Sequence, residues 1–402
     1  MTLSKFSVFA TFVLLLSHAV CYAQKPNADI LNALNQVIRP VETLDPEDSF
    51  SDLKFLDEVI ASKKVIGLGE VTHGTAEVFA YKDRLVRYLV TNHRFKAIGF
   101  ESDFIAVEHL DNYINHLADT IRFVGNFPLN RYTREMLSWL RTYNSDKAEA
   151  DRVHLYGLEA RGFYNISSKL LDAAPDLSDN GKQILNRFAT VDYYSITKKD
   201  VGQIRALVPV LRAERRLNSV SPALINHYID LLSDALDHYT KTSRGGRDEA
   251  MAKNANWIVE QTHNRKLIVW AHNGHVAKAS LFGVKKMGQY LAEAHDYYVI
   301  ATDFSEGAAL VTVQDQGRGK LSAVNYPKPD SPKIYEYYFE QLKHENFFLD
   351  ISKSQDSPAT KALFERPLDM HMIGSTPKPA YVKLAMARHF DLIIFIKKTT
   401  AS

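Results

Sequence analysis

Six short apolar runs separated by helical stretches set the architecture of this chain of 402 residues. The runs lie at 63–70, 95–101, 152–159, 265–275, 295–304 and 390–398. Each has the length and composition of a buried strand, and the segment 76–90 between the first two has the apolar spacing of a helix. Strands that alternate with helices are typical of an α/β fold with a largely parallel central sheet flanked by helices.

One connection is far longer than a crossover helix requires. It joins Glu159 to Lys266, and its apolar periodicity is helical throughout. We predict that residues 165–262 form a helical subdomain inserted over the carboxyl edge of the strands, whereas 24–164 and 263–402 form the α/β core. The alternative is that these helices only thicken one layer of the fold.

Four of the apolar runs end on an ionisable residue. These residues are Glu70, Glu101, Glu159 and His272, and His73 follows the first of them by three positions. In open parallel sheets, ligands bind outside the carboxyl ends of the strands. Four ionisable residues that converge on this edge therefore indicate a functional site, although any one alone is better explained by a turn or a hydrogen bond.

A second pair of residues extends the predicted site. His275 follows His272 by three positions, and Gly274 between them permits a turn that aims both imidazoles inward. Arg247 and Asp248 begin a predicted helix that leads into the fourth strand, so both should lie at the same edge. We expect Asp248 to stabilise the start of that helix. Arg247 is expected either to anchor a substrate carbonyl or carboxylate, or to pair with a glutamate.

Charge and motifs exclude several functions. Lys and Arg number 49 against 47 Asp and Glu, for a net charge of +2, and the basic residues form no stripe, so we expect no nucleic-acid partner. The sequence has no G-x-S-x-G elbow, no H-E-x-x-H, no G-x-G-x-x-G that opens a helix and no Walker loop. We therefore expect neither a serine hydrolase nor a dinucleotide or nucleotide cofactor, and no cofactor is predicted.

The first 23 residues resemble a secretory signal peptide. Lys5 precedes an apolar run at 6–16, and small residues lead to an expected cleavage site after Ala23. The run is too short to span a membrane, so we predict export to a periplasm or secretion, with no stable membrane insertion after cleavage. A membrane anchor and a lipoprotein signal at Cys21 are the alternatives. Cys21 is the single cysteine, so no disulfide is expected in the mature chain.

Several blocks of the sequence resemble, in order, the motifs of the erythromycin esterase family. The blocks are GLGEVTHGTAEVF, KDRLVRYLV, GFE, WLRTYN, YGLEA, RDEAMAKN and VWAHNGHV. The resemblance implies an α/β core with added helices, a deep cleft, and hydrolysis of a macrolide lactone by histidine-assisted attack of water. The motif positions that carry over as catalytic are Glu70, His73, Glu101, His272 and His275.

Three further residues are predicted to contact the substrate. They are Lys82, from the resemblance, and Arg247 and Glu159, from their positions at the edge of the sheet; the alternative for Glu159 is that Arg161 neutralises it. Lys82 stands where the family's esterases use an arginine, and lysine keeps the charge but lacks the fork that binds a carboxylate or carbonyl at two points. The expected substrate is therefore a small-molecule ester, with a macrolide and a role in macrolide resistance as the specific form.

The residues support a hypothesis for the mechanism. A neutral imidazole suits the activation of water near neutral pH, so we assign His73 as the general base and Glu70 as the group that orients it. His272 or His275 would donate to the oxyanion, and Glu101 would hold one of them in the required tautomer. The alternatives are a metal-dependent hydrolase and a periplasmic protein that binds haem or a metal without catalysis.

Overall fold

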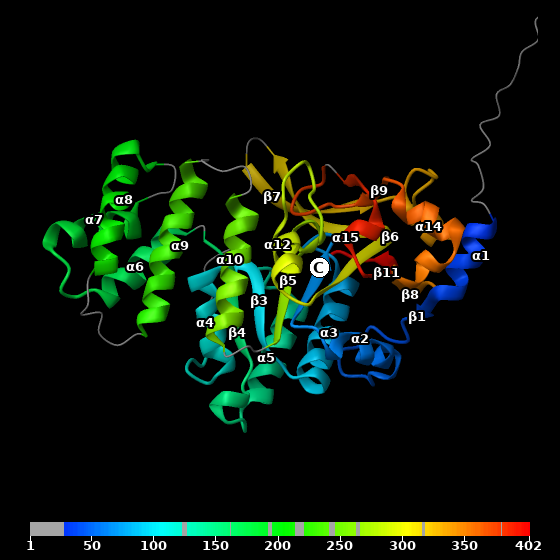
Figure 1. Ribbon diagram of the computed structural model, residues 1–402, viewed down its shortest axis with the longest axis horizontal. Coiled ribbons are helices and arrows are strands. Elements are labelled where there is room, and N and C mark those ends of the chain that lie inside the picture. The colour runs from blue at the N-terminus through cyan, green and yellow to red at the C-terminus, as the bar shows by residue number, and fades with distance from the viewer. Residues whose placement is uncertain are drawn as a thin grey trace, which may run out of the picture.

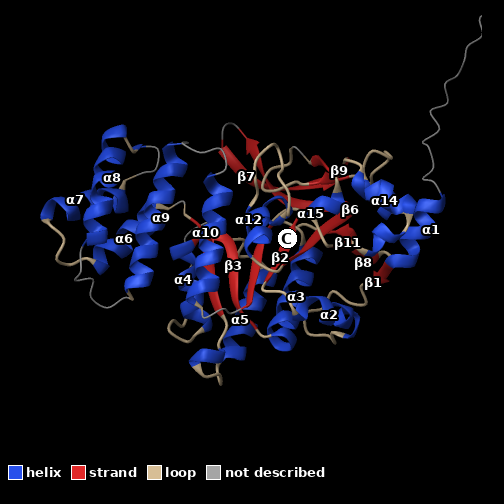
Figure 2. Cartoon of the chain, viewed as in Figure 1, coloured by secondary structure: helices blue, strands red, loops and turns tan. Residues whose placement is uncertain are grey.

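A large central sheet with helices on both faces forms the body of the protein (Figures 1 and 2). The computed structural model describes residues 28–122, 127–160, 162–191, 195–213, 221–240, 246–262, 266–315, 318–378 and 380–402. The predicted signal peptide lies outside the described residues. None of the described helices is long and apolar enough to cross a membrane. The α/β prediction is confirmed.

The six predicted strands form the parallel part of the sheet, in the order β11-β6-β2-β5-β3-β4. Their bounds are Val65–Glu70 (β2), Phe95–Asp103 (β3), His154–Glu159 (β4), Lys266–His272 (β5), Tyr297–Asp315 (β6) and Leu392–Thr399 (β11). Each was predictable because a strand buried on both faces is a continuous apolar run that can be recognised locally.

Antiparallel strands extend the sheet beyond this prediction. β8 pairs with β11, β1 pairs with β8, and β7 pairs with the long carboxyl-terminal part of β6, while β9 and β10 form a separate ribbon. Their bounds are Ile38–Pro40 (β1), Arg318–Tyr326 (β7), Asn346–Asp350 (β8), Leu368–His371 (β9) and Tyr381–Leu384 (β10). The carboxyl-terminal part of β6 and its partner β7 extend together beyond the carboxyl edge of the parallel strands (Figure 1).

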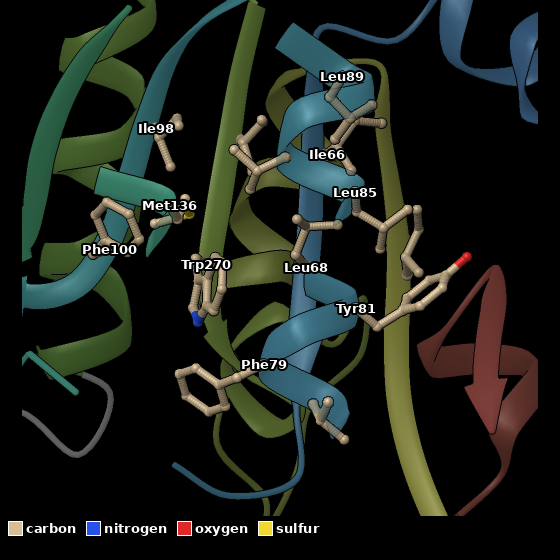
Figure 3. Close-up of a cluster of buried hydrophobic side chains, with 14 of the residues drawn as sticks. Ile66, Leu68, Phe79, Tyr81, Leu85, Leu89, Ile98, Phe100, Met136 and Trp270 are labelled. Atoms are coloured by element: carbon tan, nitrogen blue, oxygen red, sulfur yellow. The ribbon is translucent and has the colours of Figure 1, made fainter. Parts of the chain in front are cut away.

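Two hydrophobic cores lie on the two faces of the sheet. The first contains residues of α2 (Asp57–Ala61), α3 (Ala76–His93), α4 (Phe104–Ile114) and α5 (Arg131–Asn144). The second contains residues of α1 (Ala28–Val37), α10 (Gly246–Gln261), α11 (Asn273–Val276), α12 (Met287–Ala294), α13 (Tyr335–Phe339), α14 (Pro358–Glu365) and α15 (Met386–His389). In Figure 3, Ile66 and Leu68 of β2 point toward Leu85 and other apolar side chains of α3.

The glycines of the first motif have a packing role. Gly67 and Gly69 alternate with Ile66 and Leu68, so they face the second core. A Cβ atom on Gly69 would collide with the side chain of Asn273 at the start of α11. The absence of side chains here lets α11 approach the strand closely, and this approach positions the residues that follow β5.

The long connection does form helices, which are α6 (Phe163–Ala173), α7 (Asp179–Thr190), α8 (Lys198–Ala213) and α9 (Pro222–Thr240). They share a core of their own and lie beside the β4 edge, where α6 contacts α4 and α9 contacts α10 (Figure 1). Among the described residues of this connection, only Arg247 of α10 lines the cleft that is described below. The predicted position over the carboxyl edge is therefore correct only for the start of α10, and the other helices flank the site.

We expect Asp200→Ala to destabilise this helical unit. Asp200 accepts hydrogen bonds from the backbone N–H and hydroxyl of Thr197 at 2.8 and 2.7 Å, while its own N–H donates to Thr197 Oγ1. This reciprocal cap at the start of α8 should contribute about 1 kcal/mol to the free energy of unfolding. Chemical denaturation monitored by circular dichroism measures the loss.

The loss of stability caused by Asp200→Ala should depend on pH. Hydrogen bonds from Arg187 and Thr197 lower the pKa of Asp200 in the folded state. The stabilisation should therefore be complete above the unfolded pKa of about 3.9 and disappear as the pH falls below it. Asp230→Ala is the matched control, because Asp230 forms an exposed pair with Arg212 in the same unit and should change stability by less than ~1 kcal/mol. Equal losses in both variants would contradict the capping role.

Candidate active site

The carboxyl ends of the parallel strands bring the predicted catalytic residues together. Glu70 and His272 are direct neighbours in the register of β2 and β5. Beside them opens a cleft of about 1030 Å³, which is lined on its polar side by His73, Glu101, Arg247, His272 and His275. The convergence that the strand ends predicted is thus present in the structure.

The first pair of an imidazole and a carboxylate is formed by His73 and Glu70. His73 Nδ1 lies 2.7 Å from Glu70 Oε1, and Glu70 Oε2 accepts from Lys82 Nζ at 2.8 Å and from Trp270 Nε1 at 2.7 Å. Burial by itself raises the pKa of Glu70, but the charge of Lys82 and the bond from His73 outweigh it and hold the pKa well below its usual range. Because Glu70 is ionised, His73 donates through Nδ1, and its Nε2 is left as a proton acceptor.

The second pair is formed by His272 and Glu101. Glu101 Oε2 accepts from the backbone N–H of His272 at 2.9 Å, and His272 Nδ1 lies 3.0 Å from the same oxygen. His272 Nε2 has no hydrogen-bond partner among the described residues. The rings of His73 and His272 have centroids 4.2 Å apart, so two imidazoles that are each held by a carboxylate stand next to each other in the cleft.

His275 is held on both sides. Its Nδ1 lies 2.6 Å from Asp248 Oδ1, and its Nε2 lies 2.6 Å from Arg247 Nη1. Since arginine can only donate, Nε2 accepts and Nδ1 donates to Asp248. Asp248 was expected only to stabilise the start of α10. It also accepts from the backbone N–H of Met287 and orients His275, a role that sequence spacing could not reveal because the two residues are 27 positions apart.

Arg247 pairs with glutamates, which was one of the two alternatives for it, while its contact with a substrate stays a prediction. It lines the cleft, and it also donates to Glu101 Oε1 at 2.5 Å and through Nε to Glu159 Oε1 at 2.9 Å. Glu159 was predicted to contact the substrate, and this assignment is wrong. The side chain of Glu159 is buried beneath Arg247, does not line the cleft, and serves as the anion that holds the arginine in place.

The predicted role of Lys82 in substrate binding is also wrong. Lys82 is fully buried and does not line the cleft. Its Nζ donates to Glu70 and lies 4.0 Å from the centroid of the Trp270 ring. Burial lowers the pKa of Lys82 to about 8, because the attraction of Glu70 offsets only part of the desolvation. Lys82 therefore stabilises the charge of Glu70 and does not contact the substrate. The single hydrogen bond that a lysine can direct at this carboxylate is sufficient for that role.

Two overlapping groups of these side chains could hold a metal ion, Glu70 with His73 and His272, and Glu101 with His272 and His275. The carboxylates in both groups already have partners. Both oxygens of Glu70 accept hydrogen bonds, and Glu101 is bonded to Arg247 and His272. A cation in either group would also lie close to the positive charge of Lys82 or Arg247, so the donor sets fit a metal poorly.

Much of the remaining cleft lining is apolar, which the sequence did not predict. This apolar wall consists of Val71, Phe127, Leu129, Leu281, Phe282, Leu310, Leu321 and Met372. Phe282 and Leu321 are 73% and 63% exposed, so two large apolar side chains stand unprotected at this wall. Phe282 and Gly283 have φ values of 56° and 70°, a tight turn between Leu281 and Val284 that presents the phenyl ring outward. In the sequence, the glycine after Phe282 was the only local sign of this turn.

Comparison with known proteins agrees with this geometry. The family model of the erythromycin esterases matches residues 90–399. The chain belongs to the erythromycin esterase family. The match includes Glu101, His272 and His275 and begins after Glu70 and His73.

The individual proteins that the chain resembles are distant in sequence. Erythromycin esterase type I of Escherichia coli is 25% identical, over 86% of this chain and 93% of the relative. A Bacillus cereus protein of known structure is 27% identical, with a TM-score of 0.80 over 93% of this chain and 98% of its own. A solved structure described as a succinoglycan biosynthesis protein is 22% identical, with a TM-score of 0.81 over 94% of this chain and 99% of its own, which is a likeness of fold. Family membership therefore supports a hydrolase, and the substrate has to be argued from the cleft.

Proposed function

We propose that this protein is an esterase that opens the lactone of a macrolide-like substrate by attack of a water molecule that His73 activates. The observation that carries the proposal is the pair of adjacent imidazoles, each bonded through Nδ1 to a buried carboxylate. The cleft combines these polar side chains with many apolar ones, which suits a bulky ester with an apolar body. The relative from Escherichia coli is named for the same class of substrate.

In the proposed reaction, water adds to the ester carbonyl carbon while its proton passes to His73 Nε2. The oxyanion accepts hydrogen bonds from His272 Nε2 and from Arg247. His272 is preferred over His275 because both nitrogens of His275 already have partners. To donate through Nε2, His272 must carry protons on both nitrogens, because Nδ1 donates to Glu101. The intermediate then releases the alkoxide, which takes the proton back from His73, and the product is a hydroxy acid.

The decisive experiment is mass spectrometry after incubation of the protein with a panel of macrolides and simple esters. The proposal expects a mass gain of one water on a lactone, with the rate unchanged by a chelator. Loss of activity with the chelator and recovery with a metal ion would favour the metal-dependent hydrolase. A Soret absorbance band without turnover of any ester would favour the haem-binding alternative and overturn the proposal.

The proposed place of this reaction is outside the cytoplasm. The N-terminal signal predicted from residues 1–23 supports export, and an exported esterase would meet a macrolide before the drug reached the ribosome. N-terminal sequencing of the native protein is expected to begin near Gln24. An intact Met1 or Thr2 would contradict this part of the proposal.

We expect Phe282→Ala to raise KM for a macrolide by about tenfold. The exposed ring should become covered by the apolar body of the substrate, and covering an aromatic side chain contributes ~1.5–3 kcal/mol, where ~1.4 kcal/mol is tenfold in affinity. The kcat should change little, because Phe282 takes no part in the proposed proton transfers. Steady-state kinetics on a macrolide and on a small ester separate the two parameters.

The matched control is Leu117→Ala. Leu117 is 75% exposed but does not line the cleft, so its removal should leave KM unchanged for both substrates. The small ester should be insensitive to either variant because it cannot reach the apolar wall. An equal KM for the macrolide in wild-type protein and Phe282→Ala would show that this wall does not hold the substrate.

A further inference from the structure

A second cluster of ionisable side chains lies in the protein interior and takes no part in the proposed reaction. It consists of Asp303 on β6, Glu336 on α13 and His371 on β9, and all three side chains have no exposed surface. None of them lines the cleft, although Met372, the next residue after His371, does. Three fully buried ionisable groups from three separate elements require an explanation, because such groups are costly without a compensating partner.

The distances in this cluster are those of ligands around one ion. His371 Nδ1 lies 3.6 Å from Asp303 Oδ1 and 3.7 Å from Glu336 Oε1. Both distances exceed the ~3.2 Å limit of an ordinary hydrogen bond. Two nitrogen or oxygen ligands at ~2.0–2.2 Å from a common ion are at most about 4.3 Å apart, so both pairs fit a shared cation. His371 Nδ1 donates to the carbonyl oxygen of Phe304 at 3.0 Å, so a cation at this nitrogen would replace its proton and have the carbonyl as a fourth possible ligand. Asp303 Oδ1 and Glu336 Oε1 also accept backbone N–H groups at 2.8 and 2.6 Å, and each keeps a second lone pair for a cation.

The charges in the cluster are also unbalanced. In the described part of the chain, neither Asp303 nor Glu336 forms an ion pair with a lysine or arginine. Asp303 Oδ2 and Glu336 Oε2 accept no hydrogen bond from a described donor, and His371 Nε2 has no partner either. The two carboxyl groups lie within hydrogen-bonding reach of each other, so they must be neutralised by shared protons or by a cation.

We propose that Asp303, Glu336 and His371 bind a divalent cation that fixes α13 and the β9–β10 ribbon against the central sheet. Two carboxylates and a neutral imidazole balance a charge of +2, and this mixed oxygen and nitrogen donor set suits Mn²⁺ or Zn²⁺. Binding releases the protons that the carboxyl groups hold otherwise. The site is structural and separate from the cleft. Because it is enclosed, the cation should enter during folding.

The test is to unfold the full chain in denaturant with a chelator and refold it with Mn²⁺, with Zn²⁺, or with neither. After gel filtration, elemental analysis should find about one ion per chain, and thermal unfolding should show a higher Tm with the metal. The double variant Asp303→Asn/Glu336→Gln keeps the shape of both side chains and should bind no ion. The double variant His73→Gln/His275→Gln is the control, because it disrupts the two groups in the cleft and should keep the ion.

Other outcomes would overturn the proposal. Wild-type protein that refolds without stoichiometric metal, and with the same Tm in all three conditions, would mean that the two carboxyl groups simply share protons. Metal that is lost only in the cleft variant would place the ion in the active site. If Asp303→Asn/Glu336→Gln fails to fold, refolding of wild-type protein with Co²⁺ still decides, because the visible spectrum of a buried cobalt ion must persist in the cleft variant.

Discussion

Replacing His73 with Gln is expected to lower kcat for ester hydrolysis by ~10²–10⁴-fold while KM changes little. Glutamine has a similar size and can still bond to Glu70, which lies 2.7 Å from His73 Nδ1 in the wild-type protein. It cannot accept a proton from water near neutral pH. Steady-state kinetics on the substrate found by mass spectrometry, with circular dichroism to verify folding, measure the effect.

Two controls distinguish the base from its neighbours. His272→Gln should lower kcat by about 10²–10³-fold, as expected for loss of an oxyanion donor. His275→Gln should cause a smaller loss, because His275 only supports Arg247. The rate of the wild-type enzyme should also fall as the pH is lowered, since a protonated His73 cannot accept a proton. A folded His73→Gln protein with nearly wild-type turnover would show that His73 is structural and the mechanism wrong.

The parallel core and the strand-end residues could be predicted because both are local features of the sequence. A continuous apolar run identifies a strand buried on both faces, and the residue that ends the run then lies at the carboxyl edge. This reasoning located Glu70, Glu101 and His272 within one site. The added strands β1 and β8 could not be predicted in the same way, because their positions depend on pairing with β11, which no local pattern specifies.

The two wrong assignments concern charged residues whose role depends on how deeply their side chains are buried. Lys82 was expected at the substrate because it stands where the family's esterases use an arginine, and Glu159 because it ends one of the converging strands. In the structure both are buried and pair with a residue of the site. Lys82 pairs with Glu70, which is itself buried and holds His73, and Glu159 pairs with Arg247, which lines the cleft. For Lys82, the direction of the side chain depends on how α3 is rotated against the sheet. Amphipathic spacing does not show this rotation, because α3 is buried on nearly all sides.

Lys82→Met is expected to destabilise the protein by ~3–5 kcal/mol and to lower kcat by about 10²–10⁴-fold without a matching change in KM. Methionine fills a similar volume but leaves the buried carboxylate of Glu70 without its cation. The pKa of Glu70 would then rise because burial is no longer opposed by Lys82. A protonated Glu70 no longer requires His73 to carry its proton on Nδ1, so the base loses its orientation. Denaturant titration and steady-state kinetics measure the two losses.

A double variant separates the structural from the catalytic part of this effect. Glu70→Gln/Lys82→Met replaces both buried charges, so most of the stability lost in Lys82→Met should return, because an apolar or neutral pair in place of a buried ion pair is often no less stable. The activity should not return, since an amide cannot hold His73 in the tautomer that a carboxylate imposes. If Lys82 instead bound the substrate, Lys82→Met would raise KM, leave stability nearly unchanged, and gain nothing from the second substitution. The fully buried position of Lys82 makes the first outcome the expected one.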